Sequence, residues 1–207
     1  MSVGAQLLKN CMSHLSKEYY ELIPIKLGCE VRGIDLKTES RPEVIEQIQQ
    51  DVTKHRLLVF KDQGVVSGER HVEISKWFGE LESTFYKHPR SPHPDVFRVS
   101  NDDEEGCTGV GRTGWHIDGS FQEAPFSYAL YHMVSVPKKG ATTFAPLAEL
   151  VSRLPSDKRK EWEQLWMVSD RRTGPVHPLI YSHPITKEQW SVGDFIISDN
   201  LAVGHEA

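Results

Sequence analysis

Residues 114–121 read GWHIDGSF, and the prediction of the fold starts from the step His116-Ile117-Asp118 inside this stretch. In an extended segment, residues two apart project from the same face, so His116 and Asp118 can point at one place. One imidazole and one carboxylate joined by a second histidine form the facial ligand set that holds Fe(II) in non-haem oxygenases and leaves positions open. An H-x-D step alone is a weak signal, because an ordinary ionic or hydrogen-bonded pair explains most of its occurrences.

The best candidate for the second histidine is His205, which follows the apolar run FIISDN (195–200). In a double-stranded β-helix, a strand at this place reaches the end of the barrel where the H-x-D step lies. A histidine far along the chain can therefore complete the site. Three other histidines remain candidates, although each lies in a setting typical of structural residues: His132, His177 and His183.

Short strands and helices alternate in the first third of the chain, and loops follow them. The predicted elements of the first third are strands from Ile23 broken by Gly28 and Gly33, a helix over 42–55, a buried strand at 56–60 and a second helix within 69–81. Residues 87–114 are rich in Pro, Gly and acidic side chains and are predicted to be loops around one strand, 96–100. The predicted later elements are a strand at 127–136, helices split at Pro155 and a strand that leads to His205. No repeat or linker is found, so one domain is predicted.

The composition is that of a soluble globular domain of 207 residues, 38% hydrophobic and 26% charged, with a net charge of −5. The charges are interspersed without a basic stripe, so we expect no nucleic-acid partner. No apolar run approaches the roughly 18–20 residues that span a bilayer, so we expect no membrane association. Three isolated cysteines and the lack of a secretory signal predict a reduced, cytoplasmic protein.

Several stretches together resemble the taurine dioxygenase (TauD/TfdA) family of Fe(II)- and 2-oxoglutarate-dependent oxygenases. They occur in the family's order: LGCEVRGIDL, RLLVFKDQ, WFGELE, GWHIDGSF, VPKKGATTF, HPLIYSHP and WSVGDFIISDNLAVGHEA. The resemblance implies an α+β, mainly β fold, which is a double-stranded β-helix (cupin-like jelly roll) with flanking helices. It also implies a lead-in segment over 1–22 and a single oxygenase domain over 23–207.

The resemblance assigns roles residue by residue. His116, Asp118 and His205 match the family's iron ligands, and Thr143 matches the threonine that binds the 2-oxoglutarate carboxylate. Thr142 takes that role if the turn shifts by one residue. The implied reaction is the hydroxylation of a small anionic molecule, with Fe(II) as the metal and O₂ as the oxidant. The cosubstrate 2-oxoglutarate is released as succinate and CO₂.

Three further residues are implied to bind the substrate. Trp115 and Phe121 flank the H-x-D step and would wall the pocket, although plain core packing explains aromatic side chains there equally well. His88 falls where some family members contact substrate. The identity of the small-molecule substrate stays open, and a homo-oligomer is compatible with the family.

Two departures from the family pattern bear on the function. The arginine with which the family anchors the far carboxylate of 2-oxoglutarate is absent after His205, and HPLIYSHPITKEQ runs directly into WSVGDF at Gln189–Trp190. We expect that a segment near 189/190 and the C-terminal end are missing from this sequence. The alternative is a natural short form, a non-catalytic metal-binding jelly-roll protein that has lost 2-oxoglutarate binding. A Zn or Mn cupin with hydrolase or isomerase chemistry is a third hypothesis.

Overall fold

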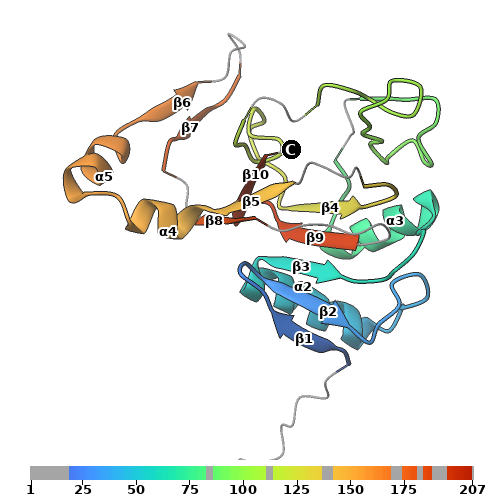
Figure 1. Ribbon diagram of the computed structural model, residues 1–207. Helices are drawn as coiled ribbons and strands as arrows, with labels where there is room; N and C mark the ends of the chain where they lie inside the picture. The colour runs from blue at the N-terminus through green and yellow to red at the C-terminus, as the bar shows by residue number, and fades with distance from the viewer. Residues whose placement is uncertain are drawn as a thin grey trace, which may run out of the picture.

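A five-stranded mixed sheet forms the centre of the fold (Figure 1). Its strands, in spatial order, are β1 (Glu21–Pro24), β2 (Cys29–Arg32), β3 (Leu57–Phe60), β9 (Phe195–Asp199) and β4 (Tyr128–His132). The strands β2 and β3 run parallel, and the other neighbours are antiparallel. The computed structural model describes residues 19–82, 86–110, 114–136, 142–168, 174–180, 184–187 and 195–206. Because β9 lies between β3 and β4, residues near 200 pair with the first third of the chain.

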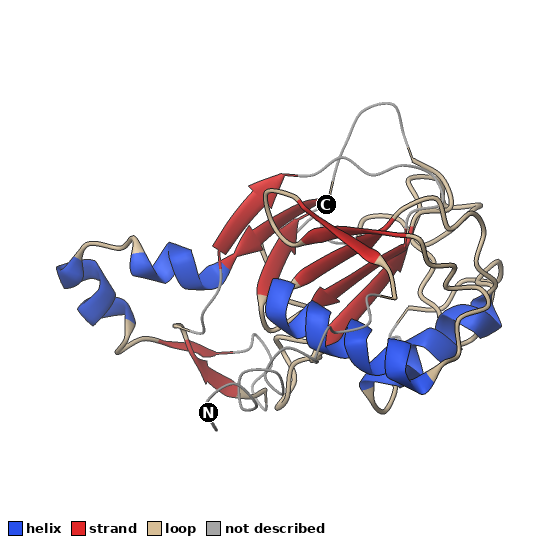
Figure 2. Cartoon of the chain, turned by 90° about the horizontal axis from the view of Figure 1, so that it is seen from below, coloured by secondary structure: helices blue, strands red, loops and turns tan. Residues whose placement is uncertain are grey.

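One face of this sheet is covered by α2 (Pro42–His55), which has the bounds predicted from the sequence (Figure 2). Proline suits the first helical position, because it lacks the N–H that a helix start leaves unpaired. Val44, Ile48 and Val52 recur at helical spacing and are fully buried. They pack with the side chains that β2, β3 and β9 turn to this face, so the helix and the sheet share one core.

The other face of the sheet packs against a second, three-stranded sheet. Its strands, in spatial order, are β10 (Val203–Glu206), β5 (Thr143–Pro146) and β8 (Pro184–Lys187). Leu57, Val59 and Ile196 of the central sheet form a buried cluster with Phe144 and Val203 of the second sheet. The strand β3 is therefore buried on both faces, which explains why its sequence is an uninterrupted apolar run.

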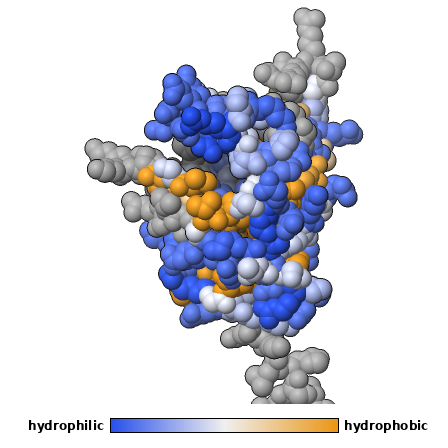
Figure 3. Space-filling model, turned by 90° about the vertical axis from the view of Figure 1, so that its right-hand side faces the viewer, coloured by the Kyte–Doolittle hydropathy of each residue, from blue (hydrophilic) through white to orange (hydrophobic). Residues whose placement is uncertain are grey.

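The remaining elements flank these packed layers, and one of them adds Ile74 to the core under α2. The helix α3 (Gly68–Ser75) ends in a 3-10 turn, η1 (Lys76–Phe78), so the helix predicted within 69–81 is shorter than its range. The face that carries α3 has apolar patches between hydrophilic side chains (Figure 3). A lobe at one side of the molecule holds α4 (Leu147–Ser152), α5 (Ser156–Trp162), β6 (Trp166–Val168) and β7 (Val176–Pro178) (Figure 1).

The structure confirms a mainly β fold with flanking helices and corrects one predicted strand. The strand expected at 96–100 is only an isolated bridge between Val99 and Cys107. The polar side chains that follow it bond to nearby backbone N–H groups, which satisfies the backbone locally instead of in a ladder. Residues 1–18 of the predicted lead-in and the Gln189–Trp190 junction lie outside the described residues. Within the described part of the chain, no helix is long and apolar enough to cross a membrane.

Candidate metal centre

The backbones of the two histidines are bonded directly to each other. His116 N–H donates to His205 O at 3.1 Å, and His205 N–H donates to His116 O at 2.8 Å, which makes an isolated antiparallel bridge. His205 lies on β10, where its register partner is Phe144 of β5, and its side chain is buried. The centroids of the two imidazole rings lie 4.3 Å apart. The chain is therefore extended at His116, as the H-x-D prediction requires.

Asp118 starts the turn that follows this bridge, and the side chain of Asn200 holds its backbone. Asn200 Oδ1 accepts from Asp118 N–H at 3.0 Å, and Asn200 Nδ2 donates to Asp118 O at 2.9 Å. The same Nδ2 donates to Phe126 O at 2.7 Å. Asn200 is 1% exposed and directly follows β9, so the central sheet positions the turn that presents the carboxylate.

The structure brings the three predicted ligands together. One ligand atom each from His116, Asp118 and His205 lies within 4.8 Å of the others. Asp118 Oδ1 is 3.9 Å from His116 Nε2 and 3.7 Å from His205 Nε2. His116 Nδ1 lies 2.8 Å from Gly114 O, which places the proton on Nδ1 and leaves the Nε2 lone pair for a metal. Two imidazoles and one carboxylate around one point are the donor set of non-haem Fe(II) sites, so these residues fit such an ion.

Tyr131, on β4, contacts two of the three ligands. Its hydroxyl donates to Asp118 Oδ2 at 2.9 Å and lies 3.4 Å from His205 Nε2. Burial raises the pKa of Tyr131 well above its usual value, and the Asp118 carboxylate adds to the effect, so the hydroxyl stays protonated. Burial also lowers the pKa of His205, an effect that Asp118 opposes and His116 reinforces. A low pKa keeps the imidazole neutral, which is the form that binds a metal.

The residues predicted for the pocket walls lie close to the ligands along the chain, and the residue predicted for the cosubstrate lies near His205 across the pair of β5 and β10. Thr143 begins β5 and precedes Phe144, the register partner of His205. Trp115 and Phe121 are 49% and 43% exposed, so the alternative of core packing is wrong for both. Their role as pocket walls stays a prediction.

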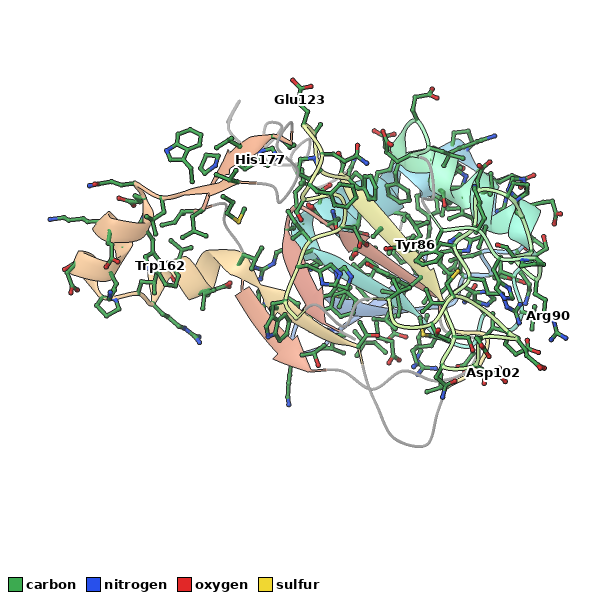
Figure 4. The ribbon with its side chains drawn as sticks, turned by 90° about the horizontal axis from the view of Figure 1, so that it is seen from above. Tyr86, Arg90, Asp102, Glu123, Trp162 and His177 are labelled. Atoms are coloured by element: carbon green, nitrogen blue, oxygen red, sulfur yellow. The ribbon has the colours of Figure 1, made fainter. Side chains whose placement is uncertain are left out.

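His88 lies in the loop 86–110, and both of its ring nitrogens bond within that loop. Nε2 lies 3.1 Å from Asp103 O, and Nδ1 accepts from Arg90 N–H at 3.2 Å. Arg90 and Asp102 of this loop lie at one end of the molecule (Figure 4). The contact of His88 with a substrate stays a prediction.

Two of the three competing histidines have the structural roles that were expected. His132 Nε2 lies 2.9 Å from a backbone oxygen of the segment between β3 and α3. His177 Nε2 lies 2.7 Å from Gln122 O, which joins the lobe to the loop after the H-x-D step. Figure 4 shows His177 beside that loop. His183 lies outside the described residues.

A family model described as "Taurine catabolism dioxygenase TauD, TfdA family" matches residues 21–189. The chain belongs to the TauD/TfdA family. The matched range contains most of both packed sheets and two of the three ligands, His116 and Asp118. The chain spans about half the length of the curated TauD/TfdA relatives it matches.

Similar proteins include dioxygenases of known sequence and structure. The chain is 28% identical over 144 residues to an alpha-ketoglutarate-dependent sulfate ester dioxygenase of Pseudomonas putida, which covers 69% of this chain and 46% of the relative. It is 28% identical over 196 residues to an alpha-ketoglutarate-dependent sulfonate dioxygenase of Saccharomyces cerevisiae, covering 79% of this chain and 46% of the relative. The crystal structure of a taurine dioxygenase from Burkholderia xenovorans superposes with a TM-score of 0.69 at 21% identity, covering 92% of this chain and 84% of that one. The chain therefore shares the fold of that structure.

Two residues of this TauD/TfdA centre, Asn200 and Tyr131, were not predicted from the sequence. An asparagine directly after an apolar strand is a signal for side-chain bonds to nearby backbone, and it could have pointed to Asn200. Tyr131 lies in the alternating strand that was predicted, but its contact with Asp118 depends on how two distant segments pack. No local pattern reports that contact.

Proposed function

We propose that this chain is an Fe(II)- and 2-oxoglutarate-dependent dioxygenase that hydroxylates a small anionic molecule, uses O₂ and releases succinate and CO₂. The observation that carries the proposal is the convergence of His116, Asp118 and His205 within 4.8 Å in a TauD/TfdA family chain. The names of the relatives support the substrate class, because they specify sulfate ester, sulfonate and 2,4-dichlorophenoxyacetate dioxygenases. All three kinds of molecule are organic anions.

The fold proposed with this activity is the double-stranded β-helix, or cupin-like jelly roll. Two observations support this fold. Two largely antiparallel sheets enclose one buried cluster, and the chain superposes on the structure of a taurine dioxygenase. In this arrangement Thr143 binds the 2-oxoglutarate carboxylate, and Trp115, Phe121 and His88 contact the substrate. The exposure of Trp115 and Phe121 beside the ligands supports their part.

The residues of the centre have different proposed roles. His116 Nε2, His205 Nε2 and Asp118 Oδ1 would hold Fe(II), which with 2-oxoglutarate supplies the oxidising chemistry when bound. The bond between His116 Nδ1 and Gly114 O orients the first imidazole, and the backbone bridge to His205 sets the spacing of the second. The side chain of His205 is buried, and this burial keeps bulk water from that ligand.

We also propose that residues are missing between Gln189 and Trp190, within the single oxygenase domain predicted over 23–207. The family match ends at residue 189, which supports a break in the pattern at this junction. Sequencing the transcript across the junction tests this idea. A natural mRNA that encodes Gln189 directly followed by Trp190 would refute this proposal.

An anaerobic titration tests the proposed function. Fe(II) and 2-oxoglutarate are added to the full chain, and the visible spectrum is scanned for the metal-to-ligand charge-transfer band of the chelated cosubstrate. We expect the band in the wild type and in His93→Ala, a histidine outside the centre whose Nδ1 lies 3.7 Å from Asp95 Oδ2. His116→Ala should abolish the band. Iron binding without a band leaves a metal-binding protein that does not take 2-oxoglutarate, and no metal binding at all refutes the proposal.

A further inference from the structure

The two oxygens of the Asp118 carboxylate have different partners. Oδ1 faces the histidines and lies 3.9 Å from His116 Nε2 and 3.7 Å from His205 Nε2. Oδ2 accepts a hydrogen bond from the Tyr131 hydroxyl at 2.9 Å. One oxygen is therefore directed to the place where an ion would lie, and the other is already bonded to the protein.

Packing on several sides holds Tyr131 in this position. The strand β4 places its ring on the face that meets the three-stranded sheet, and its backbone pairs with Ile196 of β9. The ring packs edge-on against His205, with centroids 5.6 Å apart, and against Phe144, with centroids 6.1 Å apart. The hydroxyl cannot swing away from Asp118 without moving side chains of the buried cluster.

We propose that Tyr131 is a positioning residue that restricts Asp118 to a single metal bond through Oδ1, and so keeps one further position of the bound ion open. The inference rests on the proposed function. An octahedral ion held by two imidazole nitrogens and one carboxylate oxygen keeps half of its positions open. A chelating cosubstrate fills two of these positions. If Oδ2 also bound the ion, no position would remain for O₂.

Tyr128 provides a matched control on the same strand. It lies on the opposite face of β4, where it packs against the core under α2. Its hydroxyl lies 3.1 Å from Thr53 Oγ1, so it too has a side-chain partner within hydrogen-bond distance. Phenylalanine at either position keeps the ring and removes one hydroxyl, but only the Tyr131 hydroxyl touches the metal centre.

The test uses the full chain loaded with Mn(II) alone, so it needs neither cosubstrate nor activity. Electron–nuclear double resonance in oxygen-17-labelled water counts the water molecules on Mn(II) in the wild type, Tyr131→Phe and Tyr128→Phe. We expect Tyr131→Phe to lose one bound water, because Asp118 Oδ2 takes its place, and Tyr128→Phe to lose none. Equal water counts in all three proteins overturn the inference and leave the proposed metal site intact. A wild type that binds no Mn(II) overturns the inference and the proposed function together.

A second measurement decides the question if Tyr131→Phe does not fold or binds no metal. The infrared difference spectrum of the wild type with and without Mn(II) shows the carboxylate whose stretches the ion shifts. A wide separation of the antisymmetric and symmetric stretches is typical of a single metal–oxygen bond and supports the inference. A narrow separation, typical of a chelating carboxylate, overturns it whatever the variant does.

Discussion

We expect Asn200→Ala to lower the free energy of unfolding substantially, because one side chain holds the turn that presents Asp118. The Asn200 side chain makes three hydrogen bonds, of 2.7 to 3.0 Å, to main-chain groups of Asp118 and Phe126, and the residue is 1% exposed. A buried polar group that loses its partner costs about 1–3 kcal/mol, and water that enters the cavity recovers part of this. The expected loss is therefore about 3–4 kcal/mol, a large part of the roughly 5–15 kcal/mol that stabilises a typical domain.

Urea denaturation of the metal-free protein measures this loss. With a slope of about 2 kcal/mol per molar urea, the midpoint should fall by about 1.5–2 M while the slope stays the same. Asn200→Asp separates the hydrogen bonds from the cavity, because it keeps the shape but sets an oxygen against two carbonyl oxygens. We expect it to lose at least as much stability as Asn200→Ala.

Asn101→Ala is the matched control, since Asn101 is exposed. Its stability should stay within about 0.5 kcal/mol of the wild type. A loss below about 1 kcal/mol in Asn200→Ala would refute the reasoning, because it would mean that the Asp118 turn keeps its shape without the amide.

Two further predictions concern the fold itself. Gly28 and Gly33 both have positive φ, at +79° and +83°, but a Cβ at Gly28 would lie 2.0 Å from Leu57 O, whereas a Cβ at Gly33 would meet no atom of the described residues within 4 Å. Gly33→Ala should therefore lose about 1 kcal/mol from backbone strain, and Gly28→Ala at least about 2 kcal/mol more, by urea denaturation; equal losses would contradict the clash. Burial, aided by His132, lowers the pKa of His71 to about 4, whereas an unfolded histidine has a pKa of about 6.5. The unfolded state then binds the proton first, so this contribution to stability is full above pH 6.5 and is lost as the pH falls from about 6.5 to 4. His71→Gln should flatten the dependence of the unfolding free energy on pH in that window, and an unchanged slope there would show that other groups cause it.

Local patterns predicted the helices and strands that are determined by a few adjacent residues. The helical spacing of Val44, Ile48 and Val52 and the apolar run Leu57–Phe60 each depend on a few adjacent residues, and both elements occur where they were predicted. The strand expected at 96–100 failed for the opposite reason. Its β-branched and aromatic residues have the right propensity, but the described chain provides only one bridging partner there, at Cys107.

Long-range partners could be predicted only where chemistry links them. His116, Asp118 and His205 could be grouped because a metal site needs such a set, and the structure brings their side chains together. The placement of β9 between β3 and β4 has no comparable signal in the sequence. An apolar strand can pair with several neighbouring strands equally well, because its side chains alternate between the two faces in the same way as theirs. The contacts of Asn200 and Tyr131 follow from that placement, so the sequence did not reveal them.

The metal centre joins segments that meet only in the folded chain. The H-x-D turn is held by Asn200 at the end of β9, Tyr131 comes from the strand paired with β9, and His205 lies on β10, shortly after Asn200. Since the unfolded chain contains no such site, an ion that binds it stabilises the fold by about 2.7 kcal/mol at a concentration of about 100 times its dissociation constant. Because Asn200 holds the turn that presents Asp118, Asn200→Ala should bind the ion more weakly and gain less stability from it than the wild type gains. The two effects are therefore coupled: the difference in stability between the wild type and Asn200→Ala should depend on metal, whereas the difference between the wild type and Asn101→Ala should not.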